Sequence, residues 1–167
     1  RLLGLSAIES RTSLEGAEEI DMHEILTHAV DQTRPLAEVA GISFAEQCEE
    51  SPFMVKGDAF ILRAAVTNLL ENAVDFSPRG GTVEITLAKQ ETFVVLSIRD
   101  HGEGIPDYAR ERIFERFYSL RHHTARRKGT GLGLTLVKEA AELHGGSISL
   151  DPAENGGTVA KLTLPLV

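Results

Sequence analysis

The chain has 167 residues, of which 42% are hydrophobic and 25% charged, a composition typical of one folded domain with a short extension. Its formal net charge of −8 opposes a phosphate backbone, so nucleic acid is not an expected partner. The single cysteine, Cys48, excludes an internal disulfide, and no apolar run approaches the roughly 20 residues that span a bilayer. We therefore expect no direct membrane contact by this chain.

The first part of the chain predicts two helices separated by a linker. Residues 1–13 carry a partial apolar stripe and are expected to end a helix, whereas residues 14–20 are acidic and broken by glycine, as in a linker. A second helix is expected from Asp21, which is a plausible N-cap, to the neighbourhood of Gly41. Short strand candidates follow at residues 42–48 and 52–57.

The clearest predicted helix covers residues 58–76, because apolar side chains recur along one face at helical spacing. The later elements are expected as strands at 82–89 and 93–100, a short helix at 106–117, a basic irregular segment at 118–130, a helix at 132–144 and strands at 147–152 and 158–166. This order predicts an α+β fold, a two-layer sandwich with a mixed sheet and three main helices on one face.

Polar residues also follow the helix at residues 58–76. Asn68, Glu71, Asn72 and Asp75 recur at helical spacing, which places them in one stripe beside the apolar one. Asparagine costs roughly 0.5 kcal/mol of helix propensity against alanine. Carboxamide oxygens beside a carboxylate are hard ligands that Mg²⁺ takes together with phosphate oxygens. The stripe therefore indicates a magnesium site, with an ordinary solvated helix face as the alternative.

Two glycine-rich stretches indicate a nucleotide site. In DHGEGIP, which begins at Asp100 after an apolar strand, Gly102 and Gly104 permit close backbone approach. The Asp100 carboxylate can accept a hydrogen bond from the exocyclic amine of a purine. A plain glycine turn is the alternative. In GTGLGL, residues 129–134, alternating glycines precede a helix, which favours a phosphate cradle over a flexible linker.

A fourth stretch, RIFERFYSL at residues 112–120, places Phe114 and Phe117 beside a basic cluster that runs to Gly129. Core aromatics and a solvated basic loop are the alternatives here. The patterns GxxxxGK[ST] and GxGxxG are absent, as are the HRD and DFG patterns of protein kinases, so the common nucleotide folds have no support.

Together and in this order, the four stretches resemble the N, G1, F and G2 boxes of sensor histidine kinases in two-component systems, over roughly residues 20–167. The resemblance implies the Bergerat fold of the GHKL (HATPase_c) domains, with ATP between the asparagine helix and a flexible lid. It also implies a protein-histidine kinase that transfers the ATP γ-phosphoryl group to a histidine of its own dimerisation domain, for relay to a cognate response regulator. The stretch RFYSLRHHTARRKGTGLGL faintly resembles the CreC-type, carbon-source-responsive sensors.

The resemblance also implies roles for individual residues. Glu71 and Asn72 would be catalytic, Asn68 and Asn72 would hold Mg²⁺, and Asp100 would read adenine with help from Thr158. Further expected nucleotide contacts are Asp75, Phe76, Gly102, Gly104, Ile105, Arg116, Phe117, Lys128, Gly129, Thr130, Gly131, Leu132, Gly133 and Leu134. Family members often have a lysine where this chain has Asp75, which leaves more of the phosphate binding to the lid.

The expected organisation is the tail of a dimerisation helix hairpin at 1–13, a linker at 14–20 and a catalytic ATP-binding domain at 21–167. His23, in DMHEILTH, lacks the basic residue and proline of the acceptor motif, so the phosphoacceptor is expected outside this chain. The isolated fragment is expected to be monomeric. Its parent protein is expected to be a homodimeric bacterial inner-membrane sensor in which this domain is cytoplasmic. The alternatives are an ATPase module of the gyrase, chaperone or mismatch-repair type and a non-catalytic nucleotide-binding domain.

Overall fold

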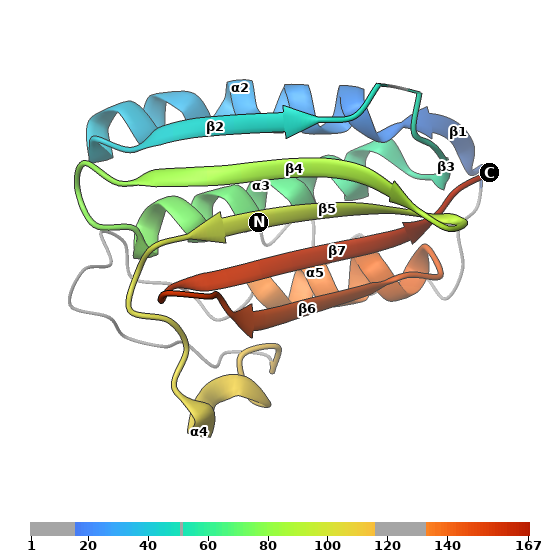
Figure 1. Ribbon diagram of the computed structural model, residues 1–167. Helices are drawn as coiled ribbons and strands as arrows, with labels where there is room; N and C mark the ends of the chain where they lie inside the picture. The colour runs from blue at the N-terminus through green and yellow to red at the C-terminus, as the bar shows by residue number, and fades with distance from the viewer. Residues whose placement is uncertain (1–15, 51, 116–132) are drawn as a thin grey trace.

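A five-stranded sheet forms one layer of the fold and helices form the other (Figure 1). The computed structural model describes residues 16–50, 52–115 and 133–167. The sheet has the order β2-β4-β5-β7-β6, and β2 and β4 are parallel while the other neighbours are antiparallel. In that order the strands are Ser43–Cys48, Thr82–Gln90, Phe93–Asp100, Thr158–Pro165 and Ser147–Pro152. The predicted mixed sheet is confirmed.

The helical layer consists of α2 (Met22–Ala40), α3 (Ala59–Phe76) and α5 (Gly133–Leu143), which cover one face of the sheet (Figure 1). Helix α3 lies in the middle, because it contacts α2 on one side, α5 on the other and β5 of the sheet. Side chains on several sides of α3 are therefore buried, and these include polar ones. Among the described helices, none is long and apolar enough to cross a membrane.

Aspartates cap the starts of two helices, and the sequence suggested the first of them, Asp21. Asp21 caps α2 by accepting a hydrogen bond from the His23 amide at 2.9 Å, and it also accepts one from the Phe53 amide at 3.0 Å. Asp58 caps α3 through the Ile61 amide, while its own amide donates to Nε2 of the buried His144 at 3.1 Å. Residue 58 thus joins the start of α3 to the end of α5.

Two expectations of local structure were wrong. The predicted linker ends in a strand, β1 (Glu18–Asp21), which pairs antiparallel with β3 (Met54–Gly57) in a separate two-stranded sheet. The helix expected at 106–117 is limited to α4 (Asp107–Arg110), followed by turns to residue 115. Past Arg110 the backbone is held by bonds such as Arg112 to Ala109 and Glu115 to Arg112, three residues apart, which form turns rather than a continuous α-helix.

Candidate functional site

A hollow lies between α3, the ends of β5 and β7, the glycine loop after β5 and the first turn of α5. The space between these elements amounts to roughly 530 Å³, including the part open to solvent. Its lining consists of Leu69, Asn72, Ala73, Phe76, Ile98, Asp100, Gly104, Ile105, Leu134, Leu150, Thr158 and Ala160. Most of these side chains are apolar, and the few polar groups stand at separate points of the wall.

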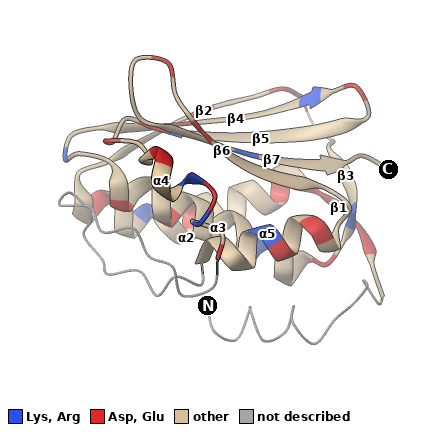
Figure 2. Cartoon of the chain, turned by 90° about the horizontal axis from the view of Figure 1, so that it is seen from below, with Lys and Arg blue, Asp and Glu red and all other residues tan. Residues whose placement is uncertain are grey.

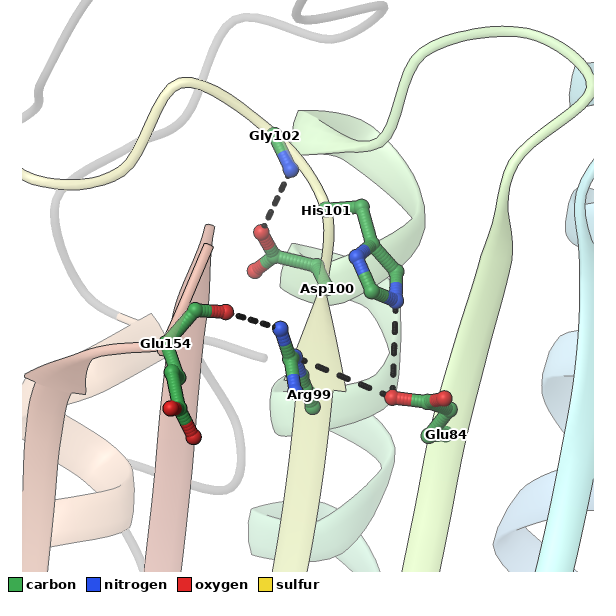
Figure 3. Close-up of polar contacts among 6 residues, drawn as sticks. All are labelled: Glu84, Arg99, Asp100, His101, Gly102 and Glu154. Atoms are coloured by element: carbon green, nitrogen blue, oxygen red, sulfur yellow. Dashed lines mark hydrogen bonds and ion pairs between the residues drawn. The ribbon is translucent and has the colours of Figure 1, made fainter. Parts of the chain in front are cut away.

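The polar end of this wall is built by pairing β5 with β7. Asp100 and Thr158 are register partners, and their side chains are 8% and 6% exposed. The Asp100 carboxylate accepts a hydrogen bond from the Gly102 amide at 2.9 Å, which starts the glycine loop (Figure 3). A carboxylate has two oxygens and about four acceptor positions, so it can accept from more than one donor.

Two glycines allow the backbone to approach closely at this end. A Cβ on Gly102 would lie 2.2 Å from the carbonyl oxygen of Phe76, so only glycine lets the loop pack against the end of α3. A Cβ on Gly157 would lie 2.1 Å from the carbonyl oxygen of Asp100, and the φ angle of Gly157 is +88°. Neither position has room for a Cβ, so both require glycine.

The other polar feature is the asparagine pair of α3. Asn72 lines the hollow, whereas Asn68, one turn earlier, is only 3% exposed. The Asn68 Nδ2 donates to the Ala64 carbonyl oxygen at 2.8 Å, but its buried Oδ1 accepts no hydrogen bond from the residues that the structure describes. A Cβ on Gly133 would lie 3.0 Å from this oxygen, so the start of α5 faces it. A buried acceptor without a donor is costly unless a ligand completes it.

Residues 57–167 match the family model of the histidine kinase-, DNA gyrase B- and HSP90-like ATPases. The chain belongs to this ATPase family. This agrees with the mixed sheet and the three helices described above.

Similar proteins place it among the sensor-kinase members of the family. The sensor protein CreC of Escherichia coli is 36% identical over 161 residues, which cover 92% of this chain and 34% of CreC. The mycobacterial sensor histidine kinase MprB has a solved structure that superposes with a TM-score of 0.78 at 34% identity, covering 90% of this chain and 97% of that one. The catalytic domain of histidine kinase ThkA gives 0.80 at 25% identity, covering 91% and 99%. The chain spans about a third of the length of the curated relatives it matches.

The structure brings together many of the site residues that the sequence suggested. In the lining of the hollow are Asn72, Phe76, Asp100, Gly104, Ile105, Leu134 and Thr158. Next to it, but not in the lining, are Asn68, Gly102 and Gly133. Glu71 is half-buried and Asp75 is buried, and neither belongs to the lining. Outside the described residues lie Arg116, Phe117, Lys128, Gly129, Thr130, Gly131 and Leu132, so their roles stay predictions.

Sequence reasoning missed about half of the apolar wall. Leu69 and Ala73 belong to the predicted apolar stripe of α3 but line the hollow, as do Ile98, Leu150 and Ala160 of the sheet. Periodicity marks such residues as inward-facing without showing which of them border empty space. The alternative of a solvated helix face fails for Asn68 and Asp75, because both are buried.

The described wall contains no lysine or arginine, and its one charged side chain is the carboxylate of Asp100. The helices carry charges of both signs, for example on α5 (Figure 2). No cluster of three histidine, cysteine or carboxylate side chains suited to a metal occurs in the described ranges. The carboxamide oxygens of α3 are hard, neutral groups of the kind that Mg²⁺ takes as ligands together with phosphate oxygens.

Proposed function

We propose that this ATPase-family domain binds Mg-ATP and transfers the γ-phosphoryl group to a histidine of a dimerisation domain in its parent protein. The observation that carries the proposal is one mainly apolar hollow lined by polar groups from both layers of the fold. Asp100 and Thr158 are buried register partners from the sheet, and Asn72 comes from α3. This combination suits a ligand with a flat base, read by the sheet residues, and a charged metal-bound chain, held by the helix.

The base end suits adenine on chemical grounds. The Asp100 carboxylate can accept a hydrogen bond from the 6-amino group of adenine, whereas guanine has a carbonyl oxygen at that position, which is itself an acceptor. The Thr158 hydroxyl, on the register partner, supplies a further donor or acceptor beside it. Apolar side chains such as Ile105 and Leu150 then cover the faces and edges of the base.

The asparagines suit Mg²⁺ because their oxygens are hard, neutral ligands. The unpartnered Oδ1 of Asn68 is buried in a place where it would gain a ligand, and Asn72 lies one turn further along the same helix. Bound there, Mg²⁺ would neutralise phosphate charge and hold the phosphate chain in one geometry. These two side chains would hold the ion from α3.

In the transfer itself, a histidine ring nitrogen attacks the γ-phosphorus, the bond between that phosphorus and the bridging oxygen breaks, and ADP leaves. The protein contributes mainly position and charge neutralisation, since little covalent chemistry falls to it. Glu71 lies on the same helix turn as Asn72 and is half-buried, so we propose it as the carboxylate that orients the attacking histidine. We assign the phosphate contacts that remain to the glycine and basic residues between 116 and 132.

The sensor-kinase relatives support further proposals for the parent protein. We propose that it is a homodimeric bacterial membrane sensor in which this domain is cytoplasmic, and that a cognate response regulator takes the phosphoryl group from the histidine. Residues 1–13 would be the tail of the dimerisation hairpin, and the isolated domain would be monomeric.

The test combines this domain with a separately made acceptor-helix domain and γ-labelled ATP. We expect Mg-dependent label on the acceptor that is labile to acid and stable to alkali, as a phosphohistidine is. Hydrolysis of ATP without such label would instead indicate an ATPase module, and binding without either would indicate a non-catalytic domain.

A matched pair of variants tests the asparagine assignment. Asn72→Ala should abolish Mg-dependent ATP binding and keep the fold, whereas Gln47→Ala removes an exposed carboxamide from the edge strand β2 and should change nothing. Unchanged ATP affinity in Asn72→Ala, measured by calorimetry, would contradict the assignment.

A further inference from the structure

Arg99 stands directly before Asp100 on β5, and its side chain lies on the opposite face of the sheet. Asp100 lines the hollow on the helix side, whereas Arg99 lines a shallow groove on the open face, together with Glu84 and Lys161. None of the described helices covers that face (Figure 1). Arg99 therefore cannot touch a ligand in the hollow.

Its guanidinium nevertheless joins the segments that hold the adenine end of the site (Figure 3). The register partner of Arg99 on β4 is Glu84, and the Arg99 Nε lies 3.7 Å from Oε2 of that carboxylate. On the other side, Nη2 donates a hydrogen bond to the carbonyl oxygen of Glu154 in the turn between β6 and β7. One cation thus spans β4, β5 and this turn.

The turn between β6 and β7 leads directly into Thr158 and helps to fix the position of this residue. Asn155, Gly156 and Gly157 all have positive φ angles, and Gly157 packs against the carbonyl oxygen of Asp100 so closely that a Cβ would clash. Thr158 follows at once as the register partner of Asp100. Holding the carbonyl of Glu154 therefore holds the segment that presents the Thr158 hydroxyl.

Glu84 contacts the two residues that precede and follow Asp100 in the sequence. Its Oε2 lies 3.4 Å from the Nε2 of His101, the residue that begins the glycine loop, as well as near Arg99. Arg99 and His101 therefore share one carboxylate, and Asp100 lies between them in the chain. The side chains are partly exposed, 27% for Arg99 and 48% for Glu84, so the pair stabilises the fold only modestly. Its geometry is the more informative property.

We propose that Arg99 is a positioning residue for adenine recognition, which sets the distance between the Asp100 carboxylate and the Thr158 hydroxyl from the far face of the sheet. The inference rests on the proposed function, because it concerns how tightly that site selects its base. A planar guanidinium is suited to the task, since its fork reaches a carboxylate and a carbonyl at once, which a lysine ammonium does not.

The experiment measures by calorimetry the affinity for ATP and for purine riboside triphosphate, which is ATP without the exocyclic amine, both with Mg²⁺. Unchanged protein should prefer ATP, because only ATP donates to Asp100. In Arg99→Ala we expect about three- to tenfold weaker ATP binding, little change for the analogue, and a correspondingly reduced preference. A merely structural role would weaken both ligands alike and leave the preference as it was.

Lys161→Ala is the matched control, because it removes a cation from the same groove on the neighbouring strand β7 and should preserve the preference. Arg99→Lys should behave like Arg99→Ala, and full recovery would show that charge alone suffices and would overturn the bridging role. Should Arg99→Ala not fold, Glu84→Gln weakens the same contacts from β4 and should reduce the preference. An unchanged preference in these variants overturns the inference, whereas absence of ATP binding by the unchanged protein overturns the proposed function.

Discussion

Asp100 of β5 and Thr158 of β7 are cross-strand partners whose side chains are both buried at one end of the same hollow. Register fixes the two polar groups relative to each other, because partners in an antiparallel pair project their side chains to the same face. The Asp100 carboxylate, an acceptor, and the Thr158 hydroxyl, a donor or acceptor, are therefore pre-organised to bind the polar edge of a flat ligand. The base-reading part of the site is therefore a property of the sheet, and the glycine loop completes it.

We predict that Asp100→Ala weakens ATP binding about tenfold to a hundredfold, since a buried hydrogen bond to a charged group is lost. Thr158→Val should cost less, about tenfold at most, because its hydroxyl is neutral. Calorimetric titration with Mg-ATP measures both effects. Thr163→Val, which alters the same strand away from the hollow, serves as the control. Normal affinity in Asp100→Ala would exclude the assignment of adenine to this end.

Asn68 provides a prediction in which stability and ligand binding move in opposite directions. Its buried Oδ1 has no donor, so Asn68→Leu, of similar volume, should raise the free energy of unfolding by about 1 kcal/mol. The same change should abolish Mg-dependent ATP binding. Denaturant unfolding without nucleotide and calorimetry with Mg-ATP give the two readouts. A variant that is destabilised and still binds Mg-ATP normally would show that the oxygen is not a ligand.

The turn between β6 and β7 offers two adjacent glycines in different surroundings. Gly156 has φ +98° and open space where a Cβ would be, whereas Gly157 has φ +88° and the Asp100 carbonyl oxygen 2.1 Å from that position. Gly156→Ala should therefore cost about 1 kcal/mol from backbone strain alone. Gly157→Ala should cost clearly more and also weaken ATP binding, because Asp100 or Thr158 must move. Chemical denaturation and nucleotide titration of both variants test this, and equal costs would refute it.

Cys48 predicts a pH-dependent reactivity that does not involve the nucleotide site. Burial, and then the neighbouring Glu46 carboxylate, raise the pKa of the Cys48 thiol, against a smaller lowering by a backbone hydrogen bond from Leu87. The folded protein should then be alkylated by iodoacetamide more slowly than the unfolded chain at pH 8, since the thiolate is the nucleophile.

The same shift affects stability at alkaline pH. Above the unfolded pKa, the unfolded thiol loses its proton while the folded one keeps it, so stability should fall as pH rises toward the folded pKa. Cys48→Ser should remove the alkylation and flatten this part of the profile. Equal alkylation rates for folded and unfolded protein would contradict the prediction.

Local patterns were sufficient for most elements of this fold. The apolar period of 58–76 predicted α3, and Asp21 and Asp58 were placed at helix starts where they indeed act as caps. The strand at Glu18–Asp21 was missed, because its partner β3 lies far away in the sequence and a short acidic segment has no period of its own. The helix expected at 106–117 was predicted too long, because apolar spacing does not show where a helix ends.

For the site, the amino-acid order by itself determined which chemical groups are available: two asparagines a turn apart, an aspartate at a strand end and glycines where backbones approach closely. Only the tertiary structure decided that Asn68 is buried without a donor among the described residues, that Thr158 is the register partner of Asp100, and that apolar residues such as Leu150 line the same hollow. Arg99 attracted no notice in the sequence, because its partners lie on another strand and in a turn. The physical reason is the same in each case. Side-chain chemistry and helical period are local properties, whereas burial, register and the closing of a hollow arise from contacts between segments that the chain order keeps apart.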